Sequence, residues 1–118
     1  MINKVERRIY YILAEQFPNH TIILNGFFSW LKSPKRFPLQ LDFFIPDLNL
    51  AIEYQGPQHY IYTPRFHRTK AKFAYYKKCD KLKIKQCALN DVKLIELKYT
   101  ETPIRETLIK KLEKIGIL

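Results

Sequence analysis

Apolar residues recur along the chain at two spacings, and the change from one to the other marks the expected elements. Steps of three and four residues predict three amphipathic helices, over residues 2–17, 69–89 and 103–115. Asn3 and Thr69 are expected to cap the first two. The apolar stripe expected on the second helix is Ala71, Tyr75, Cys79, Leu82 and Leu89, and the third is expected to place Ile104, Leu108 and Leu112 on one face. Alternating or continuous apolar runs predict four short strands, over residues 20–24, 39–45, 48–55 and 92–99. The expected order is therefore helix, three strands, helix, strand, helix.

The connections between these elements indicate how the strands pair. Pro46-Asp47 is turn chemistry between the second and third strands and predicts a hairpin. The helix of residues 69–89 joins the third and fourth strands and permits a parallel crossover. With 118 residues, the chain is expected to form one α/β domain, residues 1–118, with a mixed four-stranded sheet flanked by helices.

Two segments outside the regular pattern are rich in aromatic residues or cations. Residues 27–31 form an aromatic cluster after a turn expected at Asn25-Gly26, and two interpretations stand for it. The cluster is core packing under the sheet, or Trp30 is a wedge or stacking surface for bases. Residues 32–38 and 62–68 are expected to be exposed loops, and the segments of residues 30–37 and 60–68 that contain most of them are expected to influence substrate preference.

The charge of the chain points to a polyanionic partner. There are 21 Lys and Arg against 11 Asp and Glu, a formal net charge of +10. Such an excess favours nucleic acid as the partner, and the alternative is that the lysines only keep a small protein soluble. The cations expected to contact a phosphate backbone lie in the two loops: Lys32, Lys35, Arg36, Arg65 and Arg68.

Other patterns restrict the cellular setting. No apolar run reaches the roughly 18 to 20 residues that span a bilayer, and no signal peptide is visible, so a cytoplasmic protein without membrane contact is expected. Cys79 and Cys87 are expected on one helix, separated by about 12 Å of rise, which is too far for a disulfide. Their spacing to the three histidines matches no familiar zinc pattern.

Carboxylates interrupt the apolar pattern on the two strands of the hairpin. Side chains alternate across a strand, so Glu53 and Gln55 share one face of the third strand. Antiparallel pairing can place Asp42 of the second strand across from Glu53. Two carboxylates held that close are costly unless a cation joins them. This stretch therefore predicts a cation site.

Three further residues are candidates for the same site. Glu6 lies at the edge of the buried face of the first helix, where it could be a third acidic group or only a first-turn residue favoured by the helix dipole. His59 follows the acidic strand closely and could shuttle a proton or hold a phosphate, or be structural. Lys83 lies one turn from Asp80 and could point with it toward the site.

These residues carry a resemblance to a known family. The pattern of Asp42 followed by Glu53-Tyr54-Gln55 on the next strand resembles the PD-(D/E)XK nuclease superfamily, which has the restriction-endonuclease-like fold. More narrowly, the chain resembles small phage and mobile-element nucleases related to very short patch repair and homing endonucleases. The blocks that carry this are residues 41–46 (Leu-Asp-Phe-Phe-Ile-Pro), 52–60 (Ile-Glu-Tyr-Gln-Gly-Pro-Gln-His-Tyr), 80–83 (Asp-Lys-Leu-Lys) and 92–96 (Val-Lys-Leu-Ile-Glu).

The resemblance implies metal-dependent hydrolysis of a phosphodiester bond. Asp42, Glu53 and the backbone carbonyl of Tyr54 would bind Mg²⁺ or Mn²⁺, an all-oxygen set suited to a hard cation. Water would attack phosphorus in line while the cation stabilises the charge growing on phosphate. Further implied roles are a second metal site for Glu6, a contact to the scissile phosphate for His59 and Lys83, and positioning of the attacking water for Gln55.

Gln55 is a departure, because the superfamily most often has lysine there, and it leaves several functions open. An endonuclease acting on DNA is expected, with RNA not excluded; a monomer would favour nicking, and a homodimer would favour breaks or junctions. The alternatives are a structure-specific junction resolvase or repair nickase, and a catalytically degenerate nucleic-acid-binding module. A ribosomal or RNA-binding protein is disfavoured, because the acidic hairpin would then have no purpose.

Overall fold

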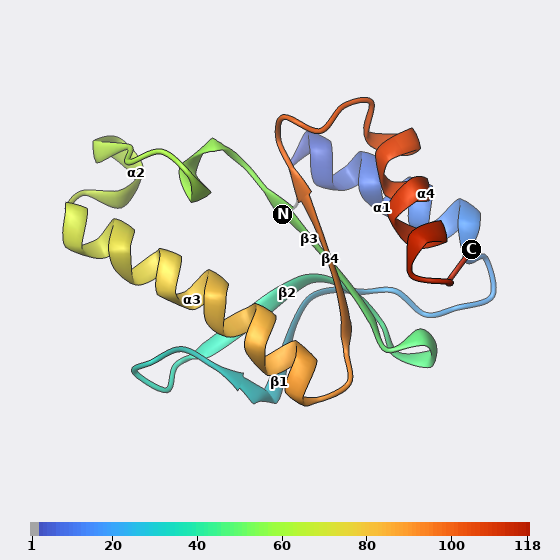
Figure 1. The fold of residues 1–118 in the computed structure, drawn as a ribbon, viewed down its shortest axis with the longest axis horizontal. Helices are drawn as coiled ribbons and strands as arrows, with labels where there is room; N and C mark the ends of the chain where they lie inside the picture. The colour runs from blue at the N-terminus through green and yellow to red at the C-terminus, as the bar shows by residue number, and fades with distance from the viewer. Residues whose placement is uncertain (1–2) are drawn as a thin grey trace.

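The computed structural model describes residues 3–118, and its centre is one mixed sheet (Figure 1). The strands, in their order across the sheet, are β1 (Ile23–Lys32), β2 (Pro38–Ile45), β3 (Leu50–Gln55) and β4 (Lys93–Lys98). Strand β2 is antiparallel to both β1 and β3, whereas β3 and β4 are parallel. The predicted hairpin and the predicted parallel crossover are both confirmed.

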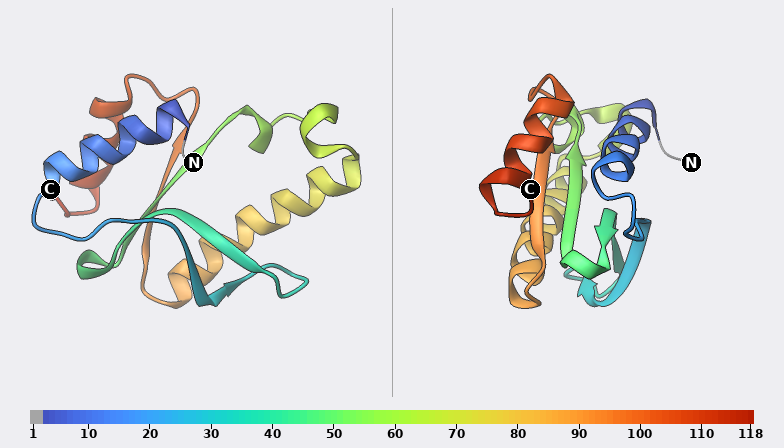
Figure 2. Two further views of the ribbon diagram at one scale, coloured as in Figure 1. Left: turned by 180° about the vertical axis from the view of Figure 1, so that it is seen from behind. Right: turned by 90° about the vertical axis from the view of Figure 1, so that its right-hand side faces the viewer.

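Helices cover both faces of this sheet. They are α1 (Lys4–Gln16), α2 (Pro64–His67), α3 (Lys70–Leu89) and α4 (Ile104–Lys114), with short 3-10 turns at Pro46–Leu48 and Pro57–His59. Figures 1 and 2 show α1 and α4 together on one side of the sheet and α3 on the other. The predicted order of elements is confirmed, with α2 as an addition inside a segment expected to be a loop. Ile2, the expected start of the first helix, lies outside the described residues.

The helix starts follow from their capping residues. The Asn3 side chain accepts a hydrogen bond from the Glu6 amide, and the Thr69 hydroxyl accepts one from the Lys72 amide. Each cap satisfies an amide that has no partner inside its helix, so α1 begins at Lys4 and α3 at Lys70, directly after their capping residues. Of the helices formed by residues 3–118, none combines the length and apolar character needed to cross a membrane.

The larger core lies between the sheet and the α1–α4 pair. Alternate residues of β3, such as Leu50 and Ile52, point into it, while Ala51 points toward α3. From α4 the buried residues are those predicted to share one face: Ile104, Leu108 and Leu112. A smaller apolar cluster under α3 contains Cys87 and residues of β1 and β2. Strand β3 is therefore packed on both faces, with apolar side chains except for the buried polar residues Glu53 and Gln55, which lie on the face toward α3.

Strand β1 differs from its prediction. The strand begins at Ile23 and continues through Asn25-Gly26, where a turn was expected. Leu24 pairs with Phe43 and Gly26 pairs with Leu41, so the same register holds on both sides of Asn25. Asn25 has a positive φ of 51°, which asparagine tolerates better than most residues. Pairing along β2 therefore outweighs the local turn chemistry of Asn-Gly.

The buried face of α3 also differs from the expected apolar stripe. Leu89, expected in that stripe, is 72% exposed, whereas Cys79 and Cys87 are buried. Gln86 and Lys83 occupy the side of α3 that meets the sheet. The Gln86 amide bonds both the N–H and the C=O of Lys32 at the end of β1. Apolar periodicity does not identify the buried face of α3, because part of that face consists of polar side chains, Lys83 and Gln86, which have hydrogen-bonding partners in the sheet.

Leu108 and Leu89 provide a test of this packing. Leu108→Ala removes a fully buried side chain from the larger core and is expected to lower the free energy of unfolding by about 2–5 kcal/mol. Leu89→Ala is expected to change it by less than about 0.5 kcal/mol, because the side chain is exposed. Urea unfolding of both variants measures the difference, and similar losses in the two would contradict the packing described.

Candidate active site

The two hairpin carboxylates lie where β2 and β3 separate. The two strands pair from Ile45↔Leu50 to Phe43↔Ile52, and beyond this point β2 pairs only with β1 and β3 only with β4. Asp42 and Glu53 are the next residues on the two strands. The Asp42 amide donates to Glu53 Oε2 at 2.6 Å, and the Tyr54 amide donates to Asp42 Oδ2 at 2.9 Å. The predicted proximity of the two carboxylates is confirmed.

Lys83 of α3 supplies the cation beside this pair. Its Nζ lies 2.7 Å from Glu53 Oε1, and the side chains of Lys83 and Glu53 are only 17% and 7% exposed. Burial by itself would lower the pKa of Lys83, but Glu53, Asp42 and Asp80 outweigh it and the net shift is upward. The ammonium therefore stays charged and offsets the negative charge of the carboxylates.

Asp42 is the residue whose ionisation the site opposes. Burial, followed by the negative charge of Glu53, raises the pKa of Asp42 from 3.8 to about 7. Glu6 of α1, half-buried, adds a smaller upward contribution, which places its charge within reach of Asp42. The site thus holds more negative charge than Lys83 alone neutralises, which is the condition that a bound cation relieves.

The donor set at the site fits a hard divalent cation. Asp42 and Glu53 present carboxylate oxygens side by side, and oxygen ligands are those that Mg²⁺ and Mn²⁺ prefer. Among residues 3–118 no three His, Cys, Asp or Glu side chains form a cluster that could hold a metal by themselves. A cation here would therefore need ligands beyond the two carboxylates, such as water and the predicted Tyr54 carbonyl. The predicted role of Glu6 at a second metal stays a prediction.

The Gln55 amide is held by neighbours that the sequence reasoning missed. Its Nε2 donates to Glu96 Oε2 on β4, and its Oε1 accepts from the Tyr60 hydroxyl at 2.5 Å. Glu96 pairs in register with Glu53 across the parallel strands. This register is the signal that could have found it, because Glu96 is the only acid in β4. Gln55 therefore faces β4 and Tyr60, and its predicted contact with water stays a prediction.

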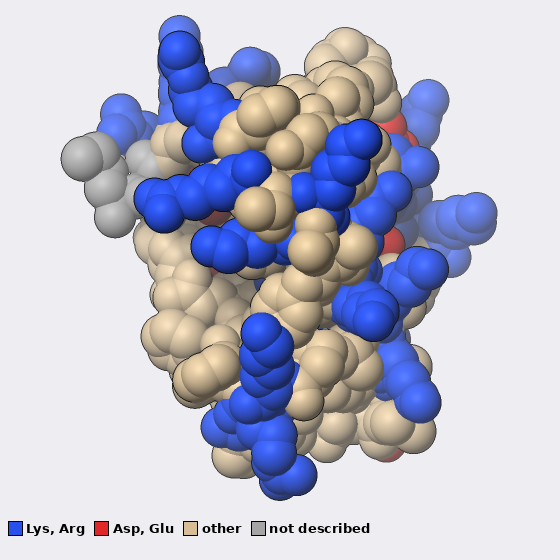
Figure 3. Space-filling model, turned by 90° about the vertical axis from the view of Figure 1, so that its left-hand side faces the viewer, with Lys and Arg blue, Asp and Glu red and all other residues tan. Residues whose placement is uncertain are grey.

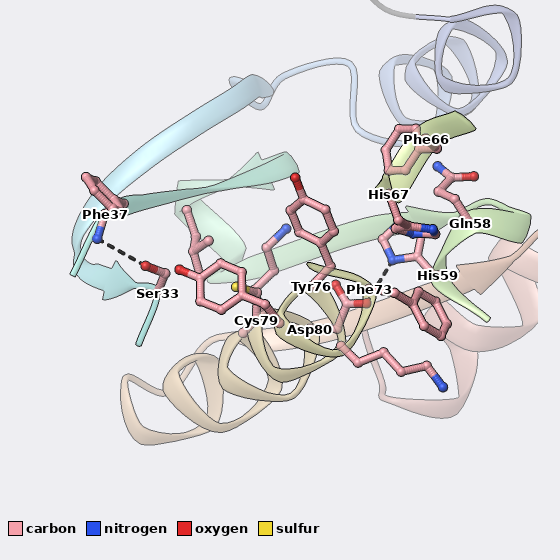
Figure 4. Close-up of a pocket in the computed structure, with 14 residues that line it drawn as sticks. Ser33, Phe37, Gln58, His59, Phe66, His67, Phe73, Tyr76, Cys79 and Asp80 are labelled. Carbon is pink, nitrogen blue, oxygen red and sulfur yellow. Dashed lines mark hydrogen bonds and ion pairs between the residues drawn. The ribbon is translucent and has the colours of Figure 1, made fainter. Parts of the chain in front are cut away.

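His59 belongs to the same neighbourhood through Asp80. Its Nδ1 lies 2.9 Å from Asp80 Oδ2, as Figure 4 shows. Asp80 lies on α3, about one helical turn before Lys83. The hydrogen bond to Asp80 raises the pKa of His59, with burial opposing it. Asp80 thus favours the protonated form of His59. This placement is consistent with the predicted contact of His59 with phosphate, which stays a prediction.

The remaining predicted contacts lie mostly on the side of the molecule formed by α2, the start of α3 and the β1–β2 turn. Lys35 and Arg36 lie in that turn, and Arg65 and Arg68 lie in or just after α2, all exposed. Figure 3 shows this side, where Lys and Arg side chains gather and few acidic groups are visible. Their predicted binding to phosphate is consistent with this placement but stays a prediction.

Trp30 and Lys32 have packing or backbone roles in the structure. Trp30 is half-buried and stacks on Phe28, with 5.4 Å between ring centroids, beside the cluster under α3. These contacts agree with the interpretation of the aromatic cluster as core packing, while a contact of Trp30 with bases stays a prediction. Lys32 is half-buried and its backbone is fixed by Gln86.

The chain is similar to viral proteins. It is 42% identical over 82 residues to Uncharacterized protein 307L of Invertebrate iridescent virus 6, an alignment that covers 70% of this chain and 42% of the viral protein. It is 37% identical over 82 residues to Uncharacterized protein 033L of Invertebrate iridescent virus 3, with 68% and 42% covered. The match thus spans less than half the length of these relatives, and their names state no activity. No family model and no solved structure matches the chain.

Asp42→Asn tests the electrostatics of the site without any metal. Between its unfolded pKa of 3.8 and its folded pKa of about 7, Asp42 binds protons more tightly in the native state, so its ionisation destabilises the fold as pH rises. Asn keeps an acceptor for the Tyr54 amide but carries no charge. The free energy of unfolding of the variant, relative to that of wild type, is expected to rise by about 2–3 kcal/mol from pH 5 to pH 8.

Denaturant unfolding in EDTA at the two pH values measures this gain. Asp91→Asn is the matched control, because Asp91 is exposed at the end of α3 and asparagine tolerates its positive φ. An Asp42→Asn stability difference that is the same at pH 5 and pH 8 would show that Asp42 titrates normally.

Proposed function

We propose that this protein is a metal-dependent endonuclease of the restriction-endonuclease-like fold, acting on DNA. The observation that carries the proposal is the carboxylate pair of half-buried Asp42 and buried Glu53, at the point where two strands of a mixed sheet separate. A fold gains no stability by holding two carboxylates together with one raised in pKa to about 7. Such perturbed groups are typical of functional sites.

Lys83 can supply the positive charge that is missing because position 55 is glutamine instead of lysine. The superfamily that the chain resembles most often has a lysine at the position of Gln55, next to the metal-binding acid. Here the ammonium that contacts Glu53 comes from α3 instead. We therefore assign to Lys83 the electrostatic role next to phosphate, and to Gln55 the role of holding Glu96 and Tyr60 in place.

The residues of the site would divide the work of phosphodiester hydrolysis as follows. Asp42 and Glu53 would hold Mg²⁺ or Mn²⁺, which when bound supplies Lewis-acid activation of water and stabilises charge on phosphate. Lys83, together with His59 in the protonated form that Asp80 favours, would bind the non-bridging oxygens of the scissile phosphate. The exposed Lys and Arg near the β1–β2 turn and α2 would hold the flanking phosphates.

A second candidate is a non-catalytic nucleic-acid-binding module. It is favoured by one observation, that both Glu53 oxygens already have partners within the protein, Lys83 Nζ and the Asp42 amide. In that case the carboxylate pair would be a relic and binding would be salt-sensitive without any need for metal. The viral relatives agree with an origin in a virus or mobile element but favour neither candidate.

Incubation of the purified protein with supercoiled plasmid, single-stranded circular DNA, branched DNA and RNA tests the proposal. Each substrate is treated in Mg²⁺, Mn²⁺ or EDTA and the products are separated on a gel. Metal-dependent cleavage of any substrate supports the nuclease, and the ratio of nicked to linear plasmid reports nicking against double-strand cleavage. Mobility shifts with no cleavage of any substrate would favour the binding module.

A further inference from the structure

A cavity of about 390 Å³ opens beside the carboxylate pair. It lies between the β1–β2 turn, the start of α3 and the segment that contains α2. Its volume is in the range of small-ligand sites, about 300–1,000 Å³. The sequence indicated that the segments around residues 30–37 and 60–68 influence substrate preference, and the structure brings residues of both to this one cavity.

Aromatic side chains from three separate elements line this cavity. Phe37 comes from the β1–β2 turn, Phe66 from α2 and Tyr76 from α3, and these three are 64%, 59% and 46% exposed. In Figure 4, Tyr76 rises from α3 between Phe37 on one side and the Phe66–His67 pair on the other. Exposed flat rings that converge on a cavity lose contact with water when a ligand enters, and a planar ligand fits them best.

Positive charge surrounds the cavity, so a planar ligand attached to phosphate is the best match. Lys35 Nζ lies 5.0 Å from the centroid of Tyr75, and Lys77 Nζ lies 5.1 Å from the centroid of Phe73, two rings of the same lining. The side of the molecule onto which these elements face carries clustered Lys and Arg (Figure 3). A basic surface interleaved with stacking rings is the pattern that binds single-stranded nucleic acid.

The cavity also shares a wall with the candidate active site. Lys83, His59 and Asp80 line it, and the Lys83 ammonium contacts Glu53. The cavity therefore reaches the lysine that contacts the carboxylate pair, and this lysine could hold the phosphate of a nucleotide whose base lies in the cavity. A base paired inside a duplex cannot enter such a cavity without leaving its stack.

We infer that this cavity binds an unpaired nucleobase, and that the substrate is single-stranded nucleic acid or a strand with an unpaired base next to the cleaved bond. Phe66 and Tyr76 stack on the base, and Gln58 at the rim offers an amide for hydrogen bonds to its edge. The inference rests on the proposed function for the cleavage step, but the binding it describes needs neither metal nor cleavage.

Binding in EDTA tests the inference separately from catalysis. The probes are a short single strand with one central 2-aminopurine and the fully paired duplex made from it. The variants are Phe66→Leu and Tyr76→Leu, which keep apolar bulk but remove the flat ring. Tyr11→Leu is the control, because Tyr11 is 63% exposed on α1, away from the cavity. Circular dichroism checks the fold of each variant.

The single strand is expected to bind about tenfold more tightly than the duplex, with quenching of the 2-aminopurine fluorescence by the rings. Each cavity variant is expected to lose about tenfold in affinity for the single strand, as removal of one stacking ring does elsewhere. Tyr11→Leu is expected to bind as wild type does. Because the two variants lie on different helices, a failure of one to fold leaves the other, and the quenching in wild type needs no variant.

Equal affinity for duplex and single strand, absence of quenching, or unchanged binding by the cavity variants would each overturn the inference. These results are distinct from failure of the proposed function. Base binding without cleavage of any substrate would contradict the proposed nuclease activity and support the base site. Metal-dependent cleavage of plain duplex, unaffected by Phe66→Leu and Tyr76→Leu, would contradict the base site and support the nuclease activity.

Discussion

Glu53→Gln is expected to lower metal-dependent cleavage about a thousandfold while leaving the protein folded. Glutamine has nearly the shape of glutamate, and its one carbonyl oxygen can keep one of the two hydrogen bonds that Glu53 accepts, from the Asp42 amide or from Lys83. It lacks the charge needed to hold a divalent cation, and loss of several kcal/mol of transition-state stabilisation corresponds to a loss of this size. Initial rates of cleavage in saturating Mn²⁺ and in Mg²⁺ measure the effect. Circular dichroism checks that the variant remains folded.

Glu113→Gln is the matched control, because Glu113 is exposed at the end of α4. It removes the same charge from the molecule and is expected to leave the rate within about twofold of wild type. Asp42→Asn is expected to resemble Glu53→Gln. Full activity in either site variant would mean that the carboxylate pair is not the metal site, even if the protein proves to be a nuclease.

Lys83→Met is expected to lower the free energy of unfolding by about 3 kcal/mol at pH 8, the typical cost of breaking a buried ion pair. Methionine fills much of the same volume but leaves Glu53 and Asp42 without their cation. The loss is expected to be smaller at pH 5, because Asp42, with a pKa of about 7, is then protonated. Chemical unfolding in EDTA at both pH values gives the comparison.

The same variant reports on cation binding. If Asp42 and Glu53 are metal ligands, Mg²⁺ or Mn²⁺ takes over part of the role of the lysine, and the divalent cation raises the Tm of Lys83→Met more than that of wild type. Lys85→Met, an exposed lysine on the same helix, serves as the control. Equal cation-induced shifts in Lys83→Met and wild type would contradict a metal site at these carboxylates.

Most of the fold could be predicted from the sequence because it follows local rules. The caps at Asn3 and Thr69, the turn at Pro46-Asp47 and the buried face of α4 each depend on residues near one another in the chain. The start of β1 and its course through Asn25 could not, because they depend on pairing with β2, about 18 residues away. Leu89 was misplaced for a related reason, since the sheet-facing side of α3 is partly polar.

The candidate site also has a part that was predictable from the sequence and a part that was not. Alternation along β3 and the hairpin register are enough to bring Asp42 and Glu53 together, so this pair was predictable. The contacts of Lys83 with Glu53 and of Gln55 with Glu96 join residues about 30 and 41 positions apart. They depend on where α3 and β4 lie relative to β3, which periodicity does not specify. The cavity is similar, because its rings come from three elements that meet only in the folded chain.

The Gln86 amide, which bonds both the N–H and the C=O of Lys32, has a consequence for self-association. Strand β1 is at the edge of the sheet, and an edge strand offers its free backbone groups to any other extended chain. At Lys32 one side chain presents the donor and the acceptor that a neighbouring strand would present, so this part of the border is already occupied. Pairing with another strand along β1 is therefore blocked at Lys32, the last residue of the strand, and a second copy that paired with this edge would have to stop short of it.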